Sequence, residues 1–306
     1  MRTTFSAVVV AVALASLAAP RTGQHHSAAT LLCGSYEHIV TAGARGTRYV
    51  VRNDNYGGRR ECLRNSSGGP NFAVVASGAR RAGQEPVAFP NIFRGCSWGV
   101  CSPDAGLPLQ VGRLGALVTG WSTRQTRRGV WDAAYDIWFA RHRCVSGQDG
   151  GAEVMIWLNS HGLRTGRGRV LTVDHRRWHL VWWRTGLGGK HWNYLRFSLV
   201  GGGTGVRRLS IGPFIALARR NRLIRPGWWL TSVEAGFEIW RGGAGLRTTG
   251  FSVRLRAAGG AVPARVRRAR SRHDSQALSR DRSGHLRRRT HRRRGHRRRQ
   301  PVVHRT

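Results

Sequence analysis

Residues 152–159 have the sequence AEVMIWLN, and the alternation of side chains along this stretch indicates the class of fold. In a β-strand, side chains two residues apart lie on the same face. One face therefore carries Glu153, Met155 and Trp157, whereas the other carries only aliphatic side chains of the kind that fill a hydrophobic core. The stretch predicts a strand with one face in the core and the opposite face holding a carboxylate beside large apolar groups.

Two further stretches, AAYDIWF and VEAGFEIW, repeat this arrangement. Asp136 precedes Trp138 by two residues in the first, and Glu238 precedes Trp240 by two residues in the second. Trp and Met are unusual on a solvated face, and carboxylates are costly in a dry core. A cleft on the concave side of a sheet accommodates both kinds of side chain, so we expect these three strands to line one.

Such a cleft suits carbohydrate chemistry, because aromatic rings can stack on sugar rings. Two carboxyl groups about 5–5.5 Å apart can hydrolyse a glycosidic bond with retention of configuration. Neighbouring strands lie about 4.8 Å apart, so carboxylates on adjacent or next-adjacent strands can reach that separation. The repeated strand context favours Glu153 and Glu238 as functional residues. We interpret Asp132 and Glu234 instead as surface residues or as ion-pair partners of one of the many arginines.

The region from Arg48 to Arg256 is a succession of short β-rich runs separated by Gly and Arg clusters, which is typical of an all-β sandwich, barrel or jelly roll. Tryptophan stripes belong more often to a core than to a ligand platform, and we interpret Trp182 and Trp183 as core residues. One segment differs, because Ser210 is placed to cap a helix whose first turn holds Pro213. Apolar residues follow at helical spacing, so we expect a single helix on a large sandwich.

The composition excludes several classes of protein. The 306 residues are 40% hydrophobic, which is too high for a fully disordered chain, and the 41 glycines show no collagen-like period. Lys and Arg number 52 against 14 Asp and Glu, a net charge of +38, so each carboxylate within a structured segment is informative. Residues 257–306 hold 17 arginines and two aspartates, which predicts a disordered tail. This tail either contacts anionic polymers or has no selected function, and the lack of a recognition motif favours the second interpretation.

The N-terminus has the features of a secretory signal. Arg2 precedes an apolar run over residues 5–19 that is short for a membrane span and ends in small residues. We expect cleavage after Ala18 or Ala19, or at a later site near Ala28, and an uncleaved membrane anchor is the alternative. No other apolar run is long enough to cross a membrane, so we expect the mature protein to be soluble and secreted.

Export makes disulfides permissible, and the chain has five cysteines. Cys96 and Cys101 bracket the short loop GCSWGVC and indicate a local disulfide. Cys33 and Cys62 lie at the ends of the first hairpin-like region and are candidates to pair, which leaves Cys144 over. No histidine lies at ligand spacing near these cysteines, so we expect no metal site.

Several stretches follow one another in the order that a known family shows. They are YVVRNDNYG, FPNIFRGCSWGVCSP, LPLQV, WDAAYDIWF, AEVMIWLNSHG, GWWLTSVEAGFEIWRGGAGL and FSVRL. In these stretches the chain resembles glycoside hydrolase family 12, a family of secreted endo-β-1,4-glucanases with a jelly-roll fold. The most specific are EVMIWLN and TSVEAGFEIWRGGAGL, and the resemblance spans roughly Leu31 to Leu255.

The resemblance implies a jelly-roll β-sandwich of two antiparallel sheets with a concave substrate cleft and a single α-helix. The catalytic domain would cover residues 30–256, between a signal peptide with a short leader at residues 1–29 and the Arg- and His-rich tail at residues 257–306. The pairs Cys33–Cys62 and Cys96–Cys101 match the two disulfides of the family. No cofactor or metal is needed, and a monomer is expected.

For the reaction, the resemblance implies a double displacement on internal β-1,4-glucosidic bonds of cellulose or a related β-glucan. Glu153 would be the nucleophile and Glu238 the acid/base, while Asp136 would hydrogen-bond near Glu153 and hold it oriented and charged. The substrate-binding residues that it implies are Tyr56, Asp54, Trp98, Trp138, Met155, Trp157 and Trp240.

The chain departs from the family pattern in the cleft. Asp54 and Tyr56 stand where the family has Asn and Trp, and Glu234 stands where Gln is common. Ser97 and Val100 stand where His and Asn are usual. These differences leave the catalytic pair intact but change groups that would bind glucan. Two alternatives therefore stay open: a xyloglucan-specific endoglucanase, and a catalytically weakened carbohydrate-binding jelly roll tethered by its basic tail.

Overall fold

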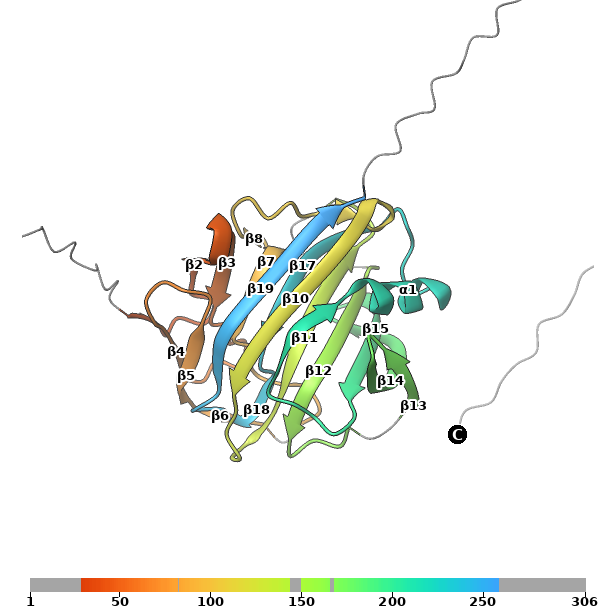
Figure 1. Cartoon of the computed structure of the whole chain (residues 1–306). Helices are drawn as coiled ribbons and strands as arrows, with labels where there is room; N and C mark the ends of the chain where they lie inside the picture. The colour runs from red at the N-terminus through yellow and green to blue at the C-terminus, as the bar shows by residue number, and fades with distance from the viewer. Residues whose placement is uncertain (1–28, 82, 144–149, 166–167, 259–306) are drawn as a thin grey trace, which may run out of the picture. The chain divides into compact units, whose positions relative to one another are not determined.

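The computed structural model describes residues 29–81, 83–143, 150–165 and 168–258 (Figure 1). The expectations for the signal segment, for Cys144 and for the arginine-rich tail beyond residue 258 fall outside these residues.

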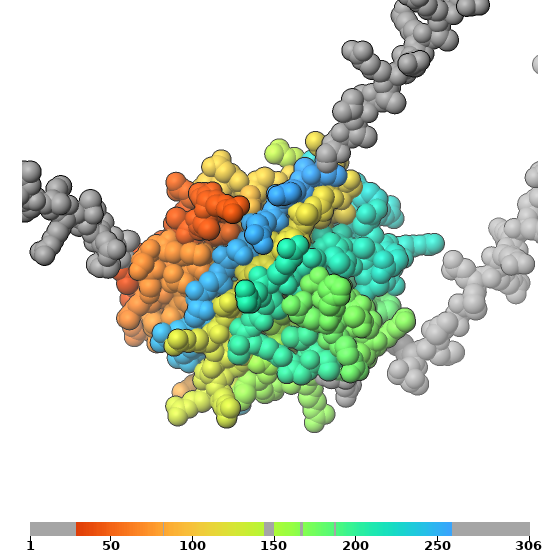
Figure 2. Space-filling view, viewed as in Figure 1, coloured from red at the N-terminus to blue at the C-terminus, as the bar shows by residue number. Residues whose placement is uncertain are grey.

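Two β-sheets and one α-helix make up the described part of the chain, together with the short 3₁₀ helices Ala44–Gly46 and Val111–Arg113. The smaller sheet has the strand order β1-β4-β5-β19-β10-β16. Its strands are β1 (Thr30–Leu32), β4 (Glu61–Asn65), β5 (Phe72–Ser77), β19 (Arg247–Ala257), β10 (Leu114–Arg124) and β16 (Gly205–Ser210). Figure 2 shows β19 and β10 lying side by side across one face of the molecule, as their antiparallel register requires.

The larger sheet has the strand order β13-β14-β15-β12-β11-β17-β7-β3-β2, with four short strands paired at its margins. Its main strands are β13 (Arg169–Val173), β14 (Arg176–Leu187), β15 (Lys190–Leu199), β12 (Ala152–His161), β11 (Val130–Ala140), β17 (Trp229–Gly236), β7 (Asn91–Ser97), β3 (Arg48–Arg52) and β2 (His38–Ala42). The short strands are β6 (Ala79–Arg80), β8 (Val100–Cys101), β9 (Leu109–Gln110) and β18 (Ile239–Gly242). Among the described strands, β12 and β15 are the one pair that runs parallel, because β13 and β14 intervene between them in the chain.

The hydrophobic core lies between the sheets and uses the strand faces that the alternation predicts. Tyr135, Ile137 and Phe139 on β11 are all buried in it. From the smaller sheet, Trp121 of β10 packs edge-on against Tyr135, with ring centroids 5.3 Å apart. The predicted two-sheet sandwich with a single helix is therefore confirmed within the described residues, and the opposite face of β11 is left for other groups.

The helix α1 (Gly212–Arg220) is where the sequence predicts it, but its start differs from the prediction. Ile211 occupies the N-cap position with no side-chain capping bond, and Pro213 lies in the first turn. Ser210 is not the cap, because it is still part of β16 and its amide donates a hydrogen bond to the Asp174 carboxylate at 3.2 Å. The buried side of the helix packs Phe214 edge-on against aromatic rings of β14 and β15.

Trp182 and Trp183 are not core residues, which corrects the prediction. Their side chains are 48% and 44% exposed. Strand β13 pairs with β14 only as far as Leu180, so the C-terminal half of β14 extends past that neighbour. Trp183 stacks on Tyr194 of β15, with ring centroids 4.3 Å apart.

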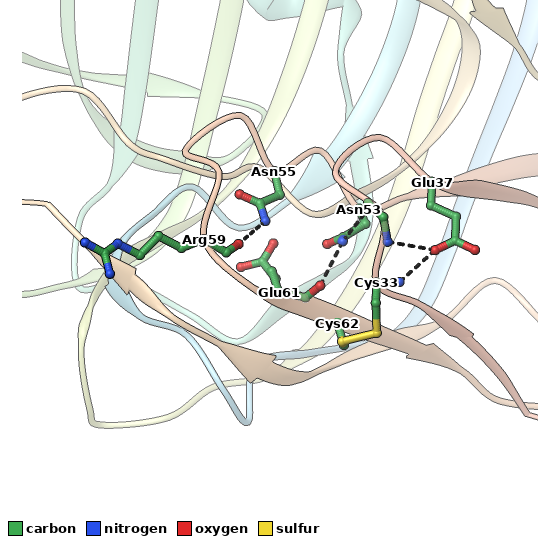
Figure 3. The surroundings of a disulfide bond; sticks show 8 residues. Cys33, Glu37, Asn53, Asn55, Arg59, Glu61 and Cys62 are labelled. Carbon is green, nitrogen blue, oxygen red and sulfur yellow. Dashed lines mark hydrogen bonds between the residues drawn. A yellow bond between two sulfur atoms is a disulfide. The ribbon is translucent and has the colours of Figure 1, made fainter.

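Both expected disulfides are present, one attached to each sheet. Cys33–Cys62 joins the residue after β1 to β4 in the smaller sheet, and Cys96–Cys101 closes the β7–β8 hairpin in the larger one. Figure 3 shows the first disulfide beside Glu61, whose backbone carbonyl accepts a hydrogen bond from the Asn53 side chain at 3.0 Å.

Candidate active site

Glu153 lies near the start of β12 on the face away from the core. Its backbone neighbours are Trp138 on β11 and Tyr194 on β15. The indole N–H of Trp192, also on β15, donates a hydrogen bond of 2.6 Å to one Glu153 oxygen. A charged acceptor strengthens such a bond, so Trp192 stabilises the ionised form of this carboxyl group.

The electrostatic surroundings of Glu153 oppose its ionisation. Burial raises the pKa of Glu153 well above its usual range, and the charge of Glu238 raises this pKa further. The Trp192 hydrogen bond acts in the other direction and lowers the pKa. Because like charges in one buried site do not ionise together readily, the pair formed by Glu153 and Glu238 tends to retain one proton.

Asp136 lies on the central strand β11, between Met155 of β12 and Glu234 of β17. The indole N–H of Trp138 donates a hydrogen bond of 2.7 Å to one of its oxygens. Burial raises the pKa of Asp136 well above its usual range, and the charge of Glu153 raises it further. The hydrogen bond that the structure gives Asp136 thus comes from its own strand, and its link to Glu153 is through charge.

Glu238 lies in the short connection between β17 and β18, which is not itself strand. The alternation of the sequence nevertheless continues, because Phe237 and Ile239 on either side are buried in the core. The Asp132 amide donates a hydrogen bond of 3.0 Å to the Glu238 carbonyl, which fixes this connection against β11. Burial raises the pKa of Glu238, whereas a side-chain hydrogen bond with Asp132 lowers it.

Asp132 is completely buried, so the interpretation as a surface residue is wrong. None of the ion pairs among the described residues involves it either. Burial raises the pKa of Asp132 well above its usual range, and both the charge of Glu238 and the hydrogen bond between the two side chains raise it further. Asp132 therefore keeps its proton to a higher pH than its usual range, and its O–H can donate to Glu238 once Glu238 is ionised.

Glu234 is buried and pairs with an arginine, so the ion-pair part of its interpretation is confirmed and the surface part is wrong. Arg52 Nη2 lies 3.5 Å from a Glu234 oxygen and 3.0 Å from a carboxylate oxygen of Asp54. The same guanidinium donates to the hydroxyl and the carbonyl of Ser97, at 3.1 and 3.3 Å. Ser232 completes the shell, since its hydroxyl donates to Glu234 at 2.8 Å. Three departures from the family pattern, Asp54, Ser97 and Glu234, thus meet on one buried arginine.

Apolar side chains form a second cluster on this face of the sheet, separate from the core between the sheets. Its buried members are Ala134, Met155, Trp157, Tyr194 and Trp240. The hydroxyl of Tyr194 donates to the Met155 sulfur at 3.2 Å, and the guanidinium of Arg196 lies 4.5 Å from the centre of the Trp157 ring. These contacts place large apolar groups beside the carboxylates, as the sequence predicts for the three strands.

Two other predicted substrate-binding residues are exposed. The side chain of Tyr56 is 46% exposed and that of Trp98 is 51% exposed. Trp98 lies in the turn of the β7–β8 hairpin, next to Ser97 and the Arg52 cluster.

Sequence reasoning missed the contribution of β15. Trp192, Tyr194 and Arg196 alternate along this strand and all face the site, where they contact Glu153, Met155 and Trp157. The same spacing of two that identified the other strands is visible in HWNYLRF. This strand carries no carboxylate, so a search for an acid followed by Trp does not find it.

Comparison with known proteins decides which family has this site. The model of the family described as glycosyl hydrolase family 12 matches residues 73–256. The chain belongs to this family. A metagenome-derived family 12 endoglucanase of known structure is 33% identical, with a TM-score of 0.69 over 76% of this chain and 99% of that chain. The endoglucanase Cel12A from Rhodothermus marinus is 35% identical, with a TM-score of 0.68 over 75% of this chain and 100% of that chain.

A relative known from its sequence agrees with these structures. The probable cellulase Cel12b of Mycobacterium tuberculosis is 28% identical over 152 residues, which are 49% of this chain and 97% of that protein. The family 12 protein described here is a glycoside hydrolase of the cellulase type, as the sequence predicts. In its described part, no helix has the length and apolar character that crossing a bilayer requires.

Proposed function

We propose that the protein is a secreted endo-β-1,4-glucanase that hydrolyses cellulose or a related β-glucan with retention of configuration. The observation that carries this proposal is the pair Glu153 on β12 and Glu238 in the β17–β18 connection, two carboxyl groups close enough for the charge of one to raise the pKa of the other, beside the second apolar cluster. Retaining hydrolysis uses two such groups, one as nucleophile and one as acid/base. The endoglucanase relatives support the substrate class.

In the first step, an oxygen of Glu153 attacks the anomeric carbon and forms a glycosyl ester as the glycosidic C–O bond breaks. Glu238 gives its proton to the departing glycosidic oxygen. The Trp192 N–H supports the nucleophile role of Glu153, because it stabilises the carboxylate form that attacks.

In the second step, Glu238 is a carboxylate and accepts a proton from water. The oxygen of that water attacks the anomeric carbon, and the bond to Glu153 breaks. Two inversions at one carbon give net retention. Asp136 lies two residues before Trp138, the residue opposite Glu153 on β11, and accepts a hydrogen bond from the Trp138 indole. We assign it the role of keeping Glu153 in the orientation needed for attack.

The aromatic side chains would hold the glucan across these carboxyl groups. Trp138 is half-buried and Tyr56 is exposed, so each presents ring surface on which a pyranose can stack. Trp157 and Trp240 are buried in the apolar cluster and shape the floor. Asp54 is held by Arg52, so it is less free to bind sugar hydroxyls than an unpaired carboxylate.

The test is reducing-sugar release by the exported protein on carboxymethylcellulose, barley β-glucan and xyloglucan in parallel. We expect Glu153→Gln and Glu238→Gln each to lower kcat by about a thousandfold or more while circular dichroism stays unchanged. Substantial activity in either variant contradicts its assignment. The ranking of the three substrates decides between a cellulase and a xyloglucanase.

A second experiment separates the two roles. With azide as an external nucleophile, a Glu153→Gly variant should yield the α-glycosyl azide, because azide replaces the missing carboxylate on the same face of the sugar. A Glu238 variant should instead yield the β-glycosyl azide. The opposite pattern would exchange the roles of the two residues.

A further inference from the structure

A cavity of about 620 Å³ lies at the C-terminal end of α1, in a part of the chain that the proposed reaction does not use. Four of its lining residues are arginines, namely Arg219, Arg220, Arg222 and Arg225. Its volume is in the range of sites that bind small ligands. Figure 1 shows α1 at one side of the molecule, and the chain turns back from its end toward β17.

Among the described residues, none of these four arginines forms an ion pair. Residues 175–233 contain ten arginines and Lys190 but no aspartate or glutamate. The ion pairs within the described residues involve Arg52 and Arg176 and none of the four arginines. Four like charges around one cavity repel one another, so an anion placed among them lowers the electrostatic energy.

The end of α1 fixes the backbone positions of three of these arginines. Arg219 and Arg220 lie in the last turn, where cations interact favourably with the helix dipole. Arg222 lies beyond the helix in the left-handed backbone region, at φ 60°, which favours glycine or asparagine. This residue follows the C-cap Asn221, a position where helices commonly end in the left-handed conformation, and its side chain is exposed.

The loop that carries these arginines is held firmly by backbone hydrogen bonds. The amide of Arg222 donates to the Arg219 carbonyl at 2.9 Å, and the amide of Leu223 donates to the Ala218 carbonyl at 3.0 Å. Farther along, the amide of Trp228 donates to the Arg225 carbonyl at 3.0 Å. The guanidinium groups therefore start from fixed backbone positions, which lowers the entropic cost of binding.

The remaining lining residues are apolar. They are Ala216, Ile224 and Pro226. A pyranose ring has an apolar face of C–H groups that such side chains can contact, and a guanidinium group binds a carboxylate through two parallel hydrogen bonds. A site for single-stranded nucleic acid would instead be expected to offer aromatic rings for base stacking, and the lining contains none.

The loop is also connected to the proposed active site. The side-chain amide of Asn193 donates to the Leu223 carbonyl at 2.8 Å. Asn193 directly follows Trp192, which donates to Glu153. Strand β15 therefore contacts both the arginine loop, through Asn193, and the proposed nucleophile, through Trp192.

We propose that this arginine-lined cavity is a second carbohydrate-binding site, which holds uronate residues of an acidic polysaccharide. Occupation of this site would keep the enzyme near neutral β-glucan that is mixed with acidic polysaccharide. Binding at the cavity requires no turnover, so its test is independent of the catalytic assignment.

The test is calorimetric titration of the full chain with tetragalacturonate, in a Glu153→Gln background so that cellotetraose can serve as the neutral comparison ligand. The cavity variant combines R219Q, R220Q, R222N and R225Q, with Asn chosen because it tolerates the left-handed backbone. The matched control combines R124Q, R247Q, R254Q and R256Q. These four exposed arginines lie on β10 and β19, and their replacement removes the same total charge.

We expect the cavity variant to bind tetragalacturonate about tenfold or more weakly and with a smaller salt dependence, and the control to change by less than about threefold. Cellotetraose binding should be the same in both variants. Equal weakening in both variants, or no binding by the parent protein, would overturn the proposal. A single-stranded oligonucleotide of equal charge that binds the cavity more tightly would overturn the choice of an acidic polysaccharide. If the fourfold variant does not fold, R222N with R225Q, both outside the helix, gives the same comparison against R254Q with R256Q.

Discussion

Asp132 and Glu238 are joined by the backbone hydrogen bond from the Asp132 amide to the Glu238 carbonyl at 3.0 Å, and each carboxyl group affects the pKa of the other. Burial raises the pKa of both groups; the charge of Glu238 raises that of Asp132 further, whereas an interaction with the Asp132 side chain opposes part of the rise at Glu238. Asp132 therefore keeps its proton to a higher pH than Glu238, and its O–H can donate a hydrogen bond to Glu238 when Glu238 is ionised. The proposed acid loses its own proton at a lower pH than it would beside a weaker donor.

The substitution Asp132→Asn tests this pair. An amide N–H is a weaker donor to a carboxylate than a carboxylic acid, so the pKa of Glu238 should rise by about one unit. We expect the basic limb of the profile of kcat/KM against pH to move to higher pH by that amount, with the acidic limb in place. The measurement is the pH profile on a soluble β-glucan. A basic limb that stays in place or moves to lower pH contradicts the argument.

Glu61 is a second buried acid, and it acts on stability. Burial raises the pKa of Glu61 to about 7 in the folded chain, from an ordinary value of 4.5. The folded state therefore holds the proton more tightly than the unfolded state. The stabilisation that results is complete below about pH 4.5 and is lost as pH rises to about 7. Above that pH the folded protein must bury an ionised carboxylate beside Cys62 (Figure 3).

The substitution Glu61→Gln removes this dependence. Relative to the parent, the free energy of unfolding of the variant should increase by up to about 3 kcal/mol as pH rises from about 4.5 to about 7. Urea unfolding at several pH values measures the difference. Glu37→Gln is the control, because Glu37 is exposed although it lies in the same region (Figure 3). A parallel gain in the control would attribute the effect to general charge instead of burial.

At the scale of elements, Arg52 connects three strands of the larger sheet. It extends from β3 and contacts Glu234 on β17 and Ser97 at the end of β7. Removal of one partner of a buried ion pair leaves the other charge uncompensated, which costs about 3–5 kcal/mol. The cluster is therefore a junction whose members depend on one another.

The substitution Arg52→Gln should lower the free energy of unfolding by about 3 kcal/mol. Addition of Glu234→Gln to this variant should restore about 1–2 kcal/mol, because a buried carboxylate without its partner is then also removed. Denaturant unfolding of the single and double variants gives the coupling energy. Arg48→Gln on the exposed end of β3 is the control and should change stability by less than about 0.5 kcal/mol. Additive effects of Arg52→Gln and Glu234→Gln on the free energy of unfolding would show that the two side chains do not stabilise each other.

The elements also show how far sequence carries the argument. Alternation along β11 and β12 predicts which side chains enter the core and which face the site, because a strand has a strict period of two. It holds even at Glu238, outside any strand. Alternation alone does not identify the strands that become neighbours, so the burial of Asp132 against Glu238 was missed. The exposure of Trp182 and Trp183 was missed for the same reason, since it depends on how far β13 extends along β14.

For the whole molecule, each sheet carries one disulfide, but the two close loops of very different length. Cys33 and Cys62 are 29 residues apart, and Cys96 and Cys101 are five residues apart. A disulfide restricts the unfolded chain more when the loop is longer. The chain-entropy relation gives about 3–4 kcal/mol for the first disulfide and about 2 kcal/mol for the second. The first should therefore have the larger effect on global unfolding.

The paired substitution of Cys33 and Cys62 by alanine should lower the free energy of unfolding by about 1–2 kcal/mol more than the same change at Cys96 and Cys101. It should therefore also cause the larger drop in the thermal midpoint. The second disulfide has the larger expected effect on function, because its loop presents the exposed ring of Trp98. Its removal should raise KM for soluble β-glucan more than it lowers kcat, since ring orientation affects binding before chemistry. Calorimetric scans and steady-state kinetics on the two variants give both comparisons. A larger loss of stability at Cys96–Cys101 would show that native-state contacts of the hairpin outweigh loop entropy in this fold.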